Sequence, residues 1–185
     1  MSPTISGFVF VGGQSTRFGS NKLFHPVNNI PMGLVVLNNL TGCVGNSCLV
    51  GPRVDHPDFV NVPQVSGDRE GHGPLGAMCD VLEKATTDFV VFAPCDTPFF
   101  MAVHFERLIK GQSGHDVVVA ADIEPPQLRH WLLSCWDVEA TRDHMIRAYS
   151  SGERAIHRAI TGLNVCEQHF SHQVLTNVNT PSDTQ

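Results

Sequence analysis

A glycine-rich stretch near the start of the chain carries the residues best suited to phosphate chemistry. Residues 11–22 read VGGQSTRFGSNK, which places three glycines, Arg17 and Lys22 within twelve positions. Glycines let the backbone approach a ligand closely, and the N–H groups of such a turn can cradle phosphate oxygens. The two cations would add charge-assisted hydrogen bonds to the same oxygens. The stretch is neither a Walker A motif nor G-x-G-x-x-G, and the alternative interpretation is a surface loop with two solvated cations.

An aspartate follows a strongly apolar run in the middle of the chain. Residues 89–93 read FVVFA, and the segment PCDTP, which contains Asp96, comes directly after them. A carboxylate at the carboxyl end of a strand can hold Mg²⁺, which binds through one or two carboxylates plus substrate phosphates. The alternative is that Asp96 caps the next helix. Opposite a phosphate-binding loop, the metal interpretation is favoured.

Two further segments could contribute to the same site. Gly67-Asp68 precedes GPLGA at residues 73–77, where the N-terminus of a helix would direct its free N–H groups at an anion. Near the end of the chain, Asn177 and Asn179 would lie on one side of an extended segment. Their amides suit the edge of a heterocycle or a phosphate. The alternative for this segment is a turn that leads into a helix cap.

These motifs can cooperate only if the fold brings them together, and the apolar pattern indicates such a fold. Short apolar strands alternate with stretches of helical periodicity, and the central strands are apolar throughout. That pattern is typical of an α/β protein with a mostly parallel, doubly wound sheet between two layers of helices. In such a sheet, ligands bind beyond the carboxyl ends of the strands, which is where the glycine stretch and Asp96 stand.

The expected elements form one domain over residues 1–185. Strands are expected at residues 5–11, 49–50, 59–62, 89–93, 117–121, 130–136, 163–166 and 174–175. Helices are expected from Pro31 to Gly42, from Pro74 through residue 85, around residues 105–109, and at residues 138–149 and 156–160. The strand at residues 130–136 is expected to run antiparallel at an edge of the sheet.

Composition argues against several classes of protein. Lys plus Arg number 12 and Asp plus Glu number 18, a net charge of −6 that disfavours a non-specific nucleic-acid binder. The sequence contains no run of about 18 consecutive apolar residues, so no membrane span is expected. The N-terminus lacks the basic start of a signal peptide. We therefore expect a cytoplasmic protein whose six cysteines stay reduced. Among ten histidines, His169 and His172 stand close together, and a structural or surface role is favoured for them over zinc binding.

Taken in order, the motifs resemble those of the molybdenum cofactor guanylyltransferases of MobA type. That family carries L-A-G-G-x-S-x-R-M-G-x-D-K, G-P-L-A-G, P-C-D-T-P and N-x-N-T-P, which here read FVGGQSTRFGSNK, GPLGA, PCDTP and NVNTP. The likeness spans nearly the whole chain. It implies a Rossmann-like nucleotidyltransferase that joins GMP from GTP to the terminal phosphate of molybdopterin, releases pyrophosphate and depends on Mg²⁺.

The resemblance also implies roles for individual residues. The nucleotide would be bound by the first motif and by two aspartates, namely Phe10, Val11, Gly12, Gly13, Lys22, Asp68 and Asp96. Catalysis would depend on Arg17, Lys22 and Asp96, with Mg²⁺ held by Asp96. Asn177 and Asn179 would contact molybdopterin. Partners beyond the two substrates would be other cofactor-assembly proteins or the molybdoenzyme that receives the product.

Several positions depart from the family pattern. Val11 stands for the usual Ala, Phe18 for Met, and Asn21 for the Asp before the lysine. After the second strand, Gly51 stands where members often carry an Asn that contacts the nucleotide. These departures leave open a cytidylyltransferase acting on the same cofactor. A sugar-phosphate nucleotidyltransferase that shares only the glycine-rich stretch is another alternative, although NVNTP argues against it. Gly51 and Asn21 would also suit a non-catalytic nucleotide-binding accessory protein.

Overall fold

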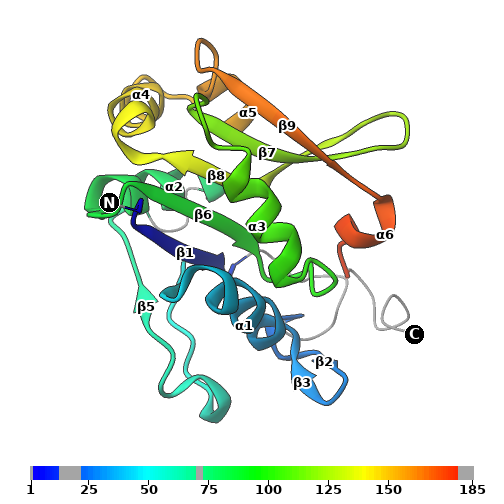
Figure 1. Cartoon of the computed structure of the whole chain (residues 1–185). Helices are drawn as coiled ribbons and strands as arrows, with labels where there is room; N and C mark the ends of the chain where they lie inside the picture. Colours follow the sequence, from blue (N-terminus) through cyan, green and yellow to red (C-terminus); the bar gives the residue numbers. More distant parts are fainter. Residues whose placement is uncertain (1, 13–21, 70–72, 179–185) are drawn as a thin grey trace.

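The computed structural model describes residues 2–12, 22–69 and 73–178. Seven strands within these ranges form one sheet (Figure 1). The strand order is β5-β4-β1-β6-β8-β7-β9. β8 pairs antiparallel with β6 and β7, and the other pairings in this sheet are parallel. The expected mostly parallel α/β sheet is therefore confirmed. The strands are β1 (Ile5–Phe10), β4 (Ser47–Val50), β5 (Gln64–Val65), β6 (Phe89–Pro94), β7 (Val117–Asp122), β8 (Arg129–Asp137) and β9 (Val165–Phe170).

Successive residues of the central strands face two separate cores. Val9 and Val91 pack into one core, whereas their neighbours Phe10 and Phe92 pack into the other. This alternation follows from the two-residue period of a strand. Because both faces are covered, these strands read as continuous apolar runs rather than as alternating polar and apolar residues.

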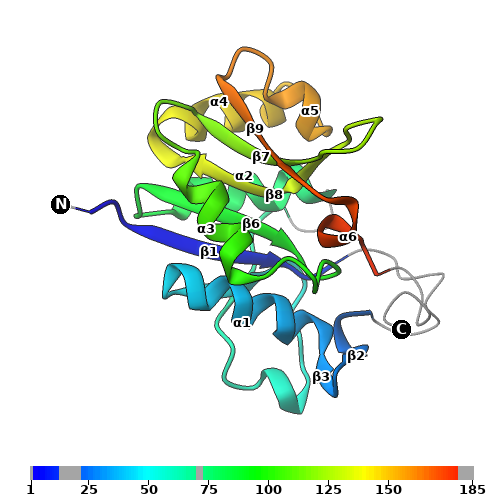
Figure 2. The ribbon, with the colours of Figure 1, turned by 45° about the vertical axis from the view of Figure 1, so that its right-hand side comes forward.

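Helices cover both faces of the sheet, which gives the expected three layers (Figures 1 and 2). One face carries α1 (Met32–Val44) and α3 (Ala102–Lys110), and Leu175 of α6 (His172–Leu175) joins the same core. The other face carries α2 (Gly73–Lys84), α4 (Val138–Ser150) and α5 (Ile156–Ala159). Among the described residues, no helix has both the length and the apolar character that crossing a membrane requires.

Four expectations about individual elements were wrong. The strand at residues 130–136 is antiparallel, as expected, but it lies between β6 and β7, and the edges are β5 and β9. Residues 59–62 are not a strand, because Pro57 starts the 3₁₀ helix η2 (Pro57–Phe59) there. Residues 174–175 belong to α6, where Leu175 is buried on one side of a short helix. α1 continues past Gly42, which lies within the helix, and ends at Val44, with Gly45 as its C-cap.

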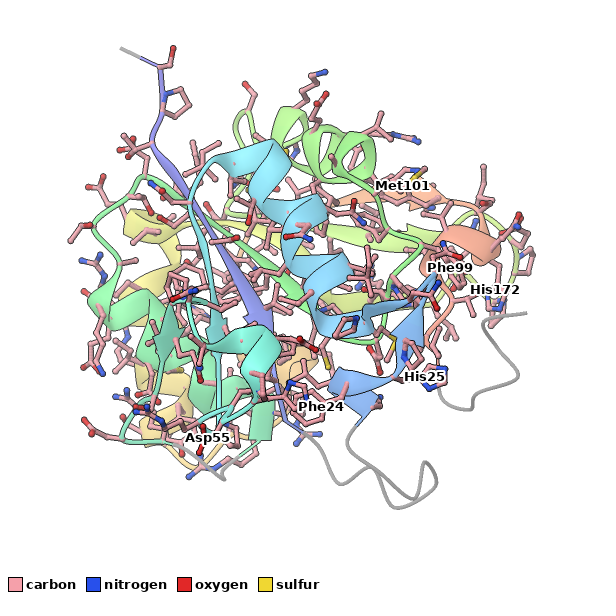
Figure 3. The ribbon with its side chains drawn as sticks, turned by 90° about the horizontal axis from the view of Figure 1, so that it is seen from below. Phe24, His25, Asp55, Phe99, Met101 and His172 are labelled. Carbon is pink, nitrogen blue, oxygen red and sulfur yellow. The ribbon has the colours of Figure 1, made fainter. Side chains whose placement is uncertain are left out.

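The end of the described chain returns to the carboxyl end of the sheet. A small third core joins Val178 to Met32 of α1 and to Val27 of the hairpin formed by β2 (Pro26–Val27) and β3 (Ile30–Pro31). Phe99, which follows β6, packs against this core. In Figure 3, which views the molecule from below, Phe99 and His172 lie on the same side of the molecule as His25 of the segment before β2. The fold thus brings segments from both ends of the chain to one region.

Candidate active site at the carboxyl edge of the sheet

The carboxyl ends of neighbouring parallel strands meet at one edge of the sheet. The Val11 N–H donates to the Val50 carbonyl at 2.9 Å and joins the ends of β1 and β4. The Gly51 N–H donates to the Val65 carbonyl at 3.2 Å and joins β4 to β5. Parallel pairing therefore places the loops after these strands side by side, as expected for a ligand site in a doubly wound sheet.

Asp96 lies at this edge and contacts Lys22. The end of β6 is tied to β1, because the Cys95 N–H donates to the Phe10 carbonyl at 3.2 Å. The Lys22 Nζ, in the 3₁₀ helix η1 (Lys22–Phe24), donates to Asp96 Oδ2. The two side chains are 20% and 10% exposed, so the ion pair is sheltered from water. The predicted convergence of Lys22 and Asp96, which are 74 positions apart in sequence, is confirmed.

The second carboxylate oxygen of Asp96 is buried without a hydrogen-bond partner among the described residues. Its neighbourhood is otherwise fixed, because the Asp96 carbonyl accepts from the Val178 N–H at 2.8 Å and the Thr97 hydroxyl donates to the Pro94 carbonyl at 3.1 Å. A buried, unpaired oxygen on a charged group is costly unless a ligand satisfies it. The helix-cap alternative was wrong, because the N-cap of α3 is Met101 rather than Asp96.

This oxygen fits a divalent cation. Mg²⁺ typically uses only one or two protein carboxylates and completes its coordination with phosphate oxygens and water. Among the described residues no group of three or more His, Cys, Asp or Glu side chains forms a complete metal site. A single carboxylate that shares a metal with substrate phosphates is consistent with both observations.

The thiol next to Asp96 is unsuited to act as a nucleophile. Burial raises the pKa of Cys95 to about 12, and the neighbouring Asp96 carboxylate adds to the rise. At neutral pH the thiol is therefore protonated, and the thiolate is the reactive form. All six cysteines lie in the described ranges and are free thiols. Chemistry at this edge must depend on charge and positioning rather than on a cysteine.

Asp68 is exposed on a loop whose backbone is held on both sides of it. The buried carboxylate of Asp80 on α2 accepts from the Arg69 backbone N–H at 3.0 Å and from Arg69 Nη1 at 2.6 Å. Gly67 packs so closely that a Cβ there would lie 1.9 Å from Asp80 Oδ2. The loop that carries Asp68 is thereby fixed to α2. Asp80 was not among the residues singled out from the sequence, because no motif distinguishes it from other helix residues.

A ring contact ties the same loop to the end of α4. The Arg69 guanidinium also binds Glu83 at 2.8 Å and lies 5.6 Å from the centre of the Tyr149 ring. The Arg154 guanidinium lies over the same ring at 3.9 Å. Arg154 and the arginine that follows Asp68 therefore meet at one aromatic ring.

Gly51 is required by the backbone rather than by a ligand. Its φ is +126°, and a Cβ there would lie 2.4 Å from the Val11 carbonyl oxygen. A side chain at this position would clash with the backbone, so an Asn here is excluded.

Of the remaining predicted residues, some lie in the described part of the chain and others lie outside it. Asn177 is exposed next to the buried Val178, so its side chain lies on the opposite side of the segment from the third core. Gly12 follows β1 at the carboxyl edge and is exposed. Gly13, Arg17 and Asn179 lie outside the described residues, and their roles stay predictions.

The sequence of this chain is similar to those of known proteins. A profile of the MobA-like NTP transferase domain matches residues 7–168. A molybdenum cofactor guanylyltransferase of Yersinia pestis (strain Pestoides F) is 28% identical over 99% of this chain and 94% of its own length.

Solved structures share the fold. Molybdopterin-guanine dinucleotide biosynthesis protein A of Archaeoglobus fulgidus superposes with a TM-score of 0.74 at 20% identity, covering 97% of this chain and 94% of its own. A 2-C-methyl-D-erythritol 4-phosphate cytidylyltransferase of Thermus thermophilus also gives 0.74, at 12% identity over 96% and 94%. At these identities the structures establish the fold alone.

Proposed function

The chain belongs to the MobA-like NTP transferase family and is a nucleotidyltransferase, and from this premise we propose that it transfers GMP from GTP to the terminal phosphate of molybdopterin. Similarity to the Yersinia guanylyltransferase along nearly the whole chain supports this choice of substrates. A terminal phosphate oxygen of molybdopterin would attack the α-phosphorus of GTP. The bond from that phosphorus to the oxygen bridging the α- and β-phosphates would break, and pyrophosphate would leave with the bonding electrons.

This reaction needs no protein nucleophile. Joining two phosphates concentrates negative charge, so catalysis requires alignment of the reactants and cations that offset the charge. Lys22, which contacts Asp96, would bind phosphate oxygens next to it. We assign Arg17 the same task and assign the backbone at residues 10–13 to the nucleotide. Asp68 would bind the nucleotide from the loop held by Asp80.

Asp96 would hold Mg²⁺ through its unpaired oxygen. The cation would neutralise charge on the phosphates during transfer. Lys22 would bind the opposite oxygen of the same carboxylate, so that Asp96 is fixed in orientation. Asn177 and Asn179 would contact molybdopterin from the segment whose backbone meets Asp96 through the Val178 N–H.

One observation carries this proposal. Lys22 from the glycine-rich motif and Asp96 from PCDTP touch at the carboxyl edge, and the free oxygen of Asp96 is buried among the described residues without a partner. In an ion pair with only a structural role, both buried carboxylate oxygens would normally have hydrogen-bond partners.

The test is pyrophosphate release by the purified protein with Mg²⁺ and molybdopterin prepared anaerobically. GTP, CTP and ATP are compared, and a sugar 1-phosphate replaces molybdopterin in a parallel reaction. The proposal predicts release with GTP and molybdopterin, and loss of release in Asp96→Asn while the protein stays folded. Release only with the sugar 1-phosphate, or no release with any nucleotide, would contradict it.

Cytidylyl transfer to the same cofactor is the second candidate because of Gly51. The position where family members often carry a nucleotide-binding Asn has no room for a side chain here. Thermal stabilisation by GTP, CTP and ATP in the presence of Mg²⁺ separates the two candidates, because at equal concentration the nucleotide that binds the folded protein more tightly raises its stability more. Selective stabilisation by CTP would favour cytidylyl transfer.

A further inference from the structure

A second buried carboxylate stands at the carboxyl end of β7. Asp122 is 3% exposed, and its two oxygens bind two different histidines. His130 Nε2 lies 3.1 Å from Oδ2, and His172 Nδ1 lies 3.0 Å from Oδ1. An ionised carboxylate only accepts hydrogen bonds, so each ring nitrogen carries the proton. His169 adds a third contact, from Nδ1 to the Asp122 carbonyl at 3.2 Å.

The histidines keep this carboxylate ionised. Burial alone would raise the pKa of Asp122, but hydrogen bonds and charge from His130 and His172 outweigh that effect and lower it. Two further acidic side chains lie next to these histidines. Glu124 accepts from the His172 backbone N–H at 3.1 Å, and Glu167 lies 3.8 Å from His169 Nε2. His172 therefore contacts one carboxylate through its ring and another through its backbone.

His172 begins the last described segment of the chain. It is the first residue of α6, which has only four residues and is too short to be stable by itself. From there the segment runs past the buried Leu175 and the exposed Asn177 to Val178, whose N–H donates to the Asp96 carbonyl. The segment is thus fixed at Asp122 on one end and at Asp96 on the other.

We propose that Asp122, acting through His172 and supported by His130, is a positioning residue for the phosphorylated heterocycle that receives the nucleotide. It would hold residues 172–178 against the Asp96 side, so that Asn177 is presented to that substrate in a fixed place. The inference rests on the proposed function for the identity of the substrate. It assigns a task to the His169–His172 region, for which the sequence favoured a structural or surface role.

The experiment compares two pairs of variants. His172→Ala removes the ring contact, whereas His172→Asn keeps an N–H donor near the place of Nδ1 and is expected to restore it. Asp122→Asn weakens the carboxylate end of the contact. Its matched control is Asp116→Asn, because Asp116 precedes β7 at the opposite end and accepts from the Asn164 N–H at 2.8 Å. The His172 side chain is 73% exposed, so its variants are expected to fold.

Two measurements are made on each variant. Amide hydrogen exchange resolved by residue is expected to show about tenfold faster exchange at Val178 in His172→Ala, with the central strands unchanged. Steady-state kinetics with GTP and molybdopterin are expected to show KM for molybdopterin raised about three- to tenfold, with KM for GTP unchanged. His172→Asn and Asp116→Asn are expected to behave like the unmodified protein.

Specific results would overturn the inference. Unchanged exchange at Val178 in His172→Ala would show that the contact does not hold the segment. Equal increases in both KM values, or a loss of stability without a change in either, would show that the role is structural. If the unmodified protein transfers no nucleotide to molybdopterin, the proposed function and the substrate assignment fail together. Faster exchange confined to residues 172–178 would still support the anchor in that case.

Discussion

Replacement of Gly51 by alanine tests whether the backbone geometry at the carboxyl edge of the sheet requires a glycine there. A residue at φ +126° lies in a region that L side chains rarely adopt, which costs about 1–3 kcal/mol. The new Cβ would lie 2.4 Å from the Val11 carbonyl oxygen, a contact that only a backbone shift can relieve. Such a shift would weaken the hydrogen bonds that join β1, β4 and β5 at this edge, each worth about 1 kcal/mol. The sum is a loss of about 2–4 kcal/mol in the free energy of unfolding.

The assay is urea unfolding together with thermal unfolding. For a chain of this length, Tm is expected to fall by about 10 °C in Gly51→Ala. The matched control is Gly42→Ala, because Gly42 lies inside α1 and a Cβ there meets nothing within 4 Å. Alanine at that position should stabilise the protein by about 0.5–1 kcal/mol. If Gly51→Ala were as stable as Gly42→Ala, the argument from backbone geometry would be refuted.

Three further results are expected. Asp80→Asn should lower the free energy of unfolding by about 2–3 kcal/mol in urea titrations, because it leaves the Arg69 guanidinium with a weakened partner. An unchanged urea midpoint would show that the Asp80–Arg69 contact does not hold the loop. Cys95 should resist thiol reagents in the folded protein at pH 8, because its pKa is raised to about 12, and rapid labelling identified by mass spectrometry would contradict this. Hydrogen bonds from Arg158 and from the backbone of residues 154 and 155 lower the pKa of Glu153 to about 2. Its contribution to stability is therefore present above about pH 4.3 and lost as pH falls toward 2, so Glu153→Gln should flatten the acid limb of a stability-against-pH curve.

The sequence predicted those parts of the fold in which one residue type dominates a whole element. β1 and β6 are apolar on both faces, so their runs were recognisable without a structure. The interior place of β8 was not, because strand order depends on pairings between distant segments. The expected strand at residues 59–62 failed because Pro57 and the cap by His56 favour a 3₁₀ helix.

The site divides in the same way. Lys22 and Asp96 lie in short motifs whose residue types already suggested phosphate and metal chemistry. Asp80 and Asp122 carry no such pattern, because their importance comes from burial next to Arg69 and next to two histidines. A carboxylate on a helix or at a strand end is common, and only its partners in three dimensions distinguish it.

The measurement that tests the central claim most directly is a double-mutant cycle on Lys22 and Asp96. Lys22→Met, Asp96→Asn and the double variant are compared by kcat/KM for pyrophosphate release. Because the two side chains share one contact, the second substitution should cost much less once the first is made. Losses that simply multiply, or a single variant with full activity, would show that these residues do not form one catalytic centre.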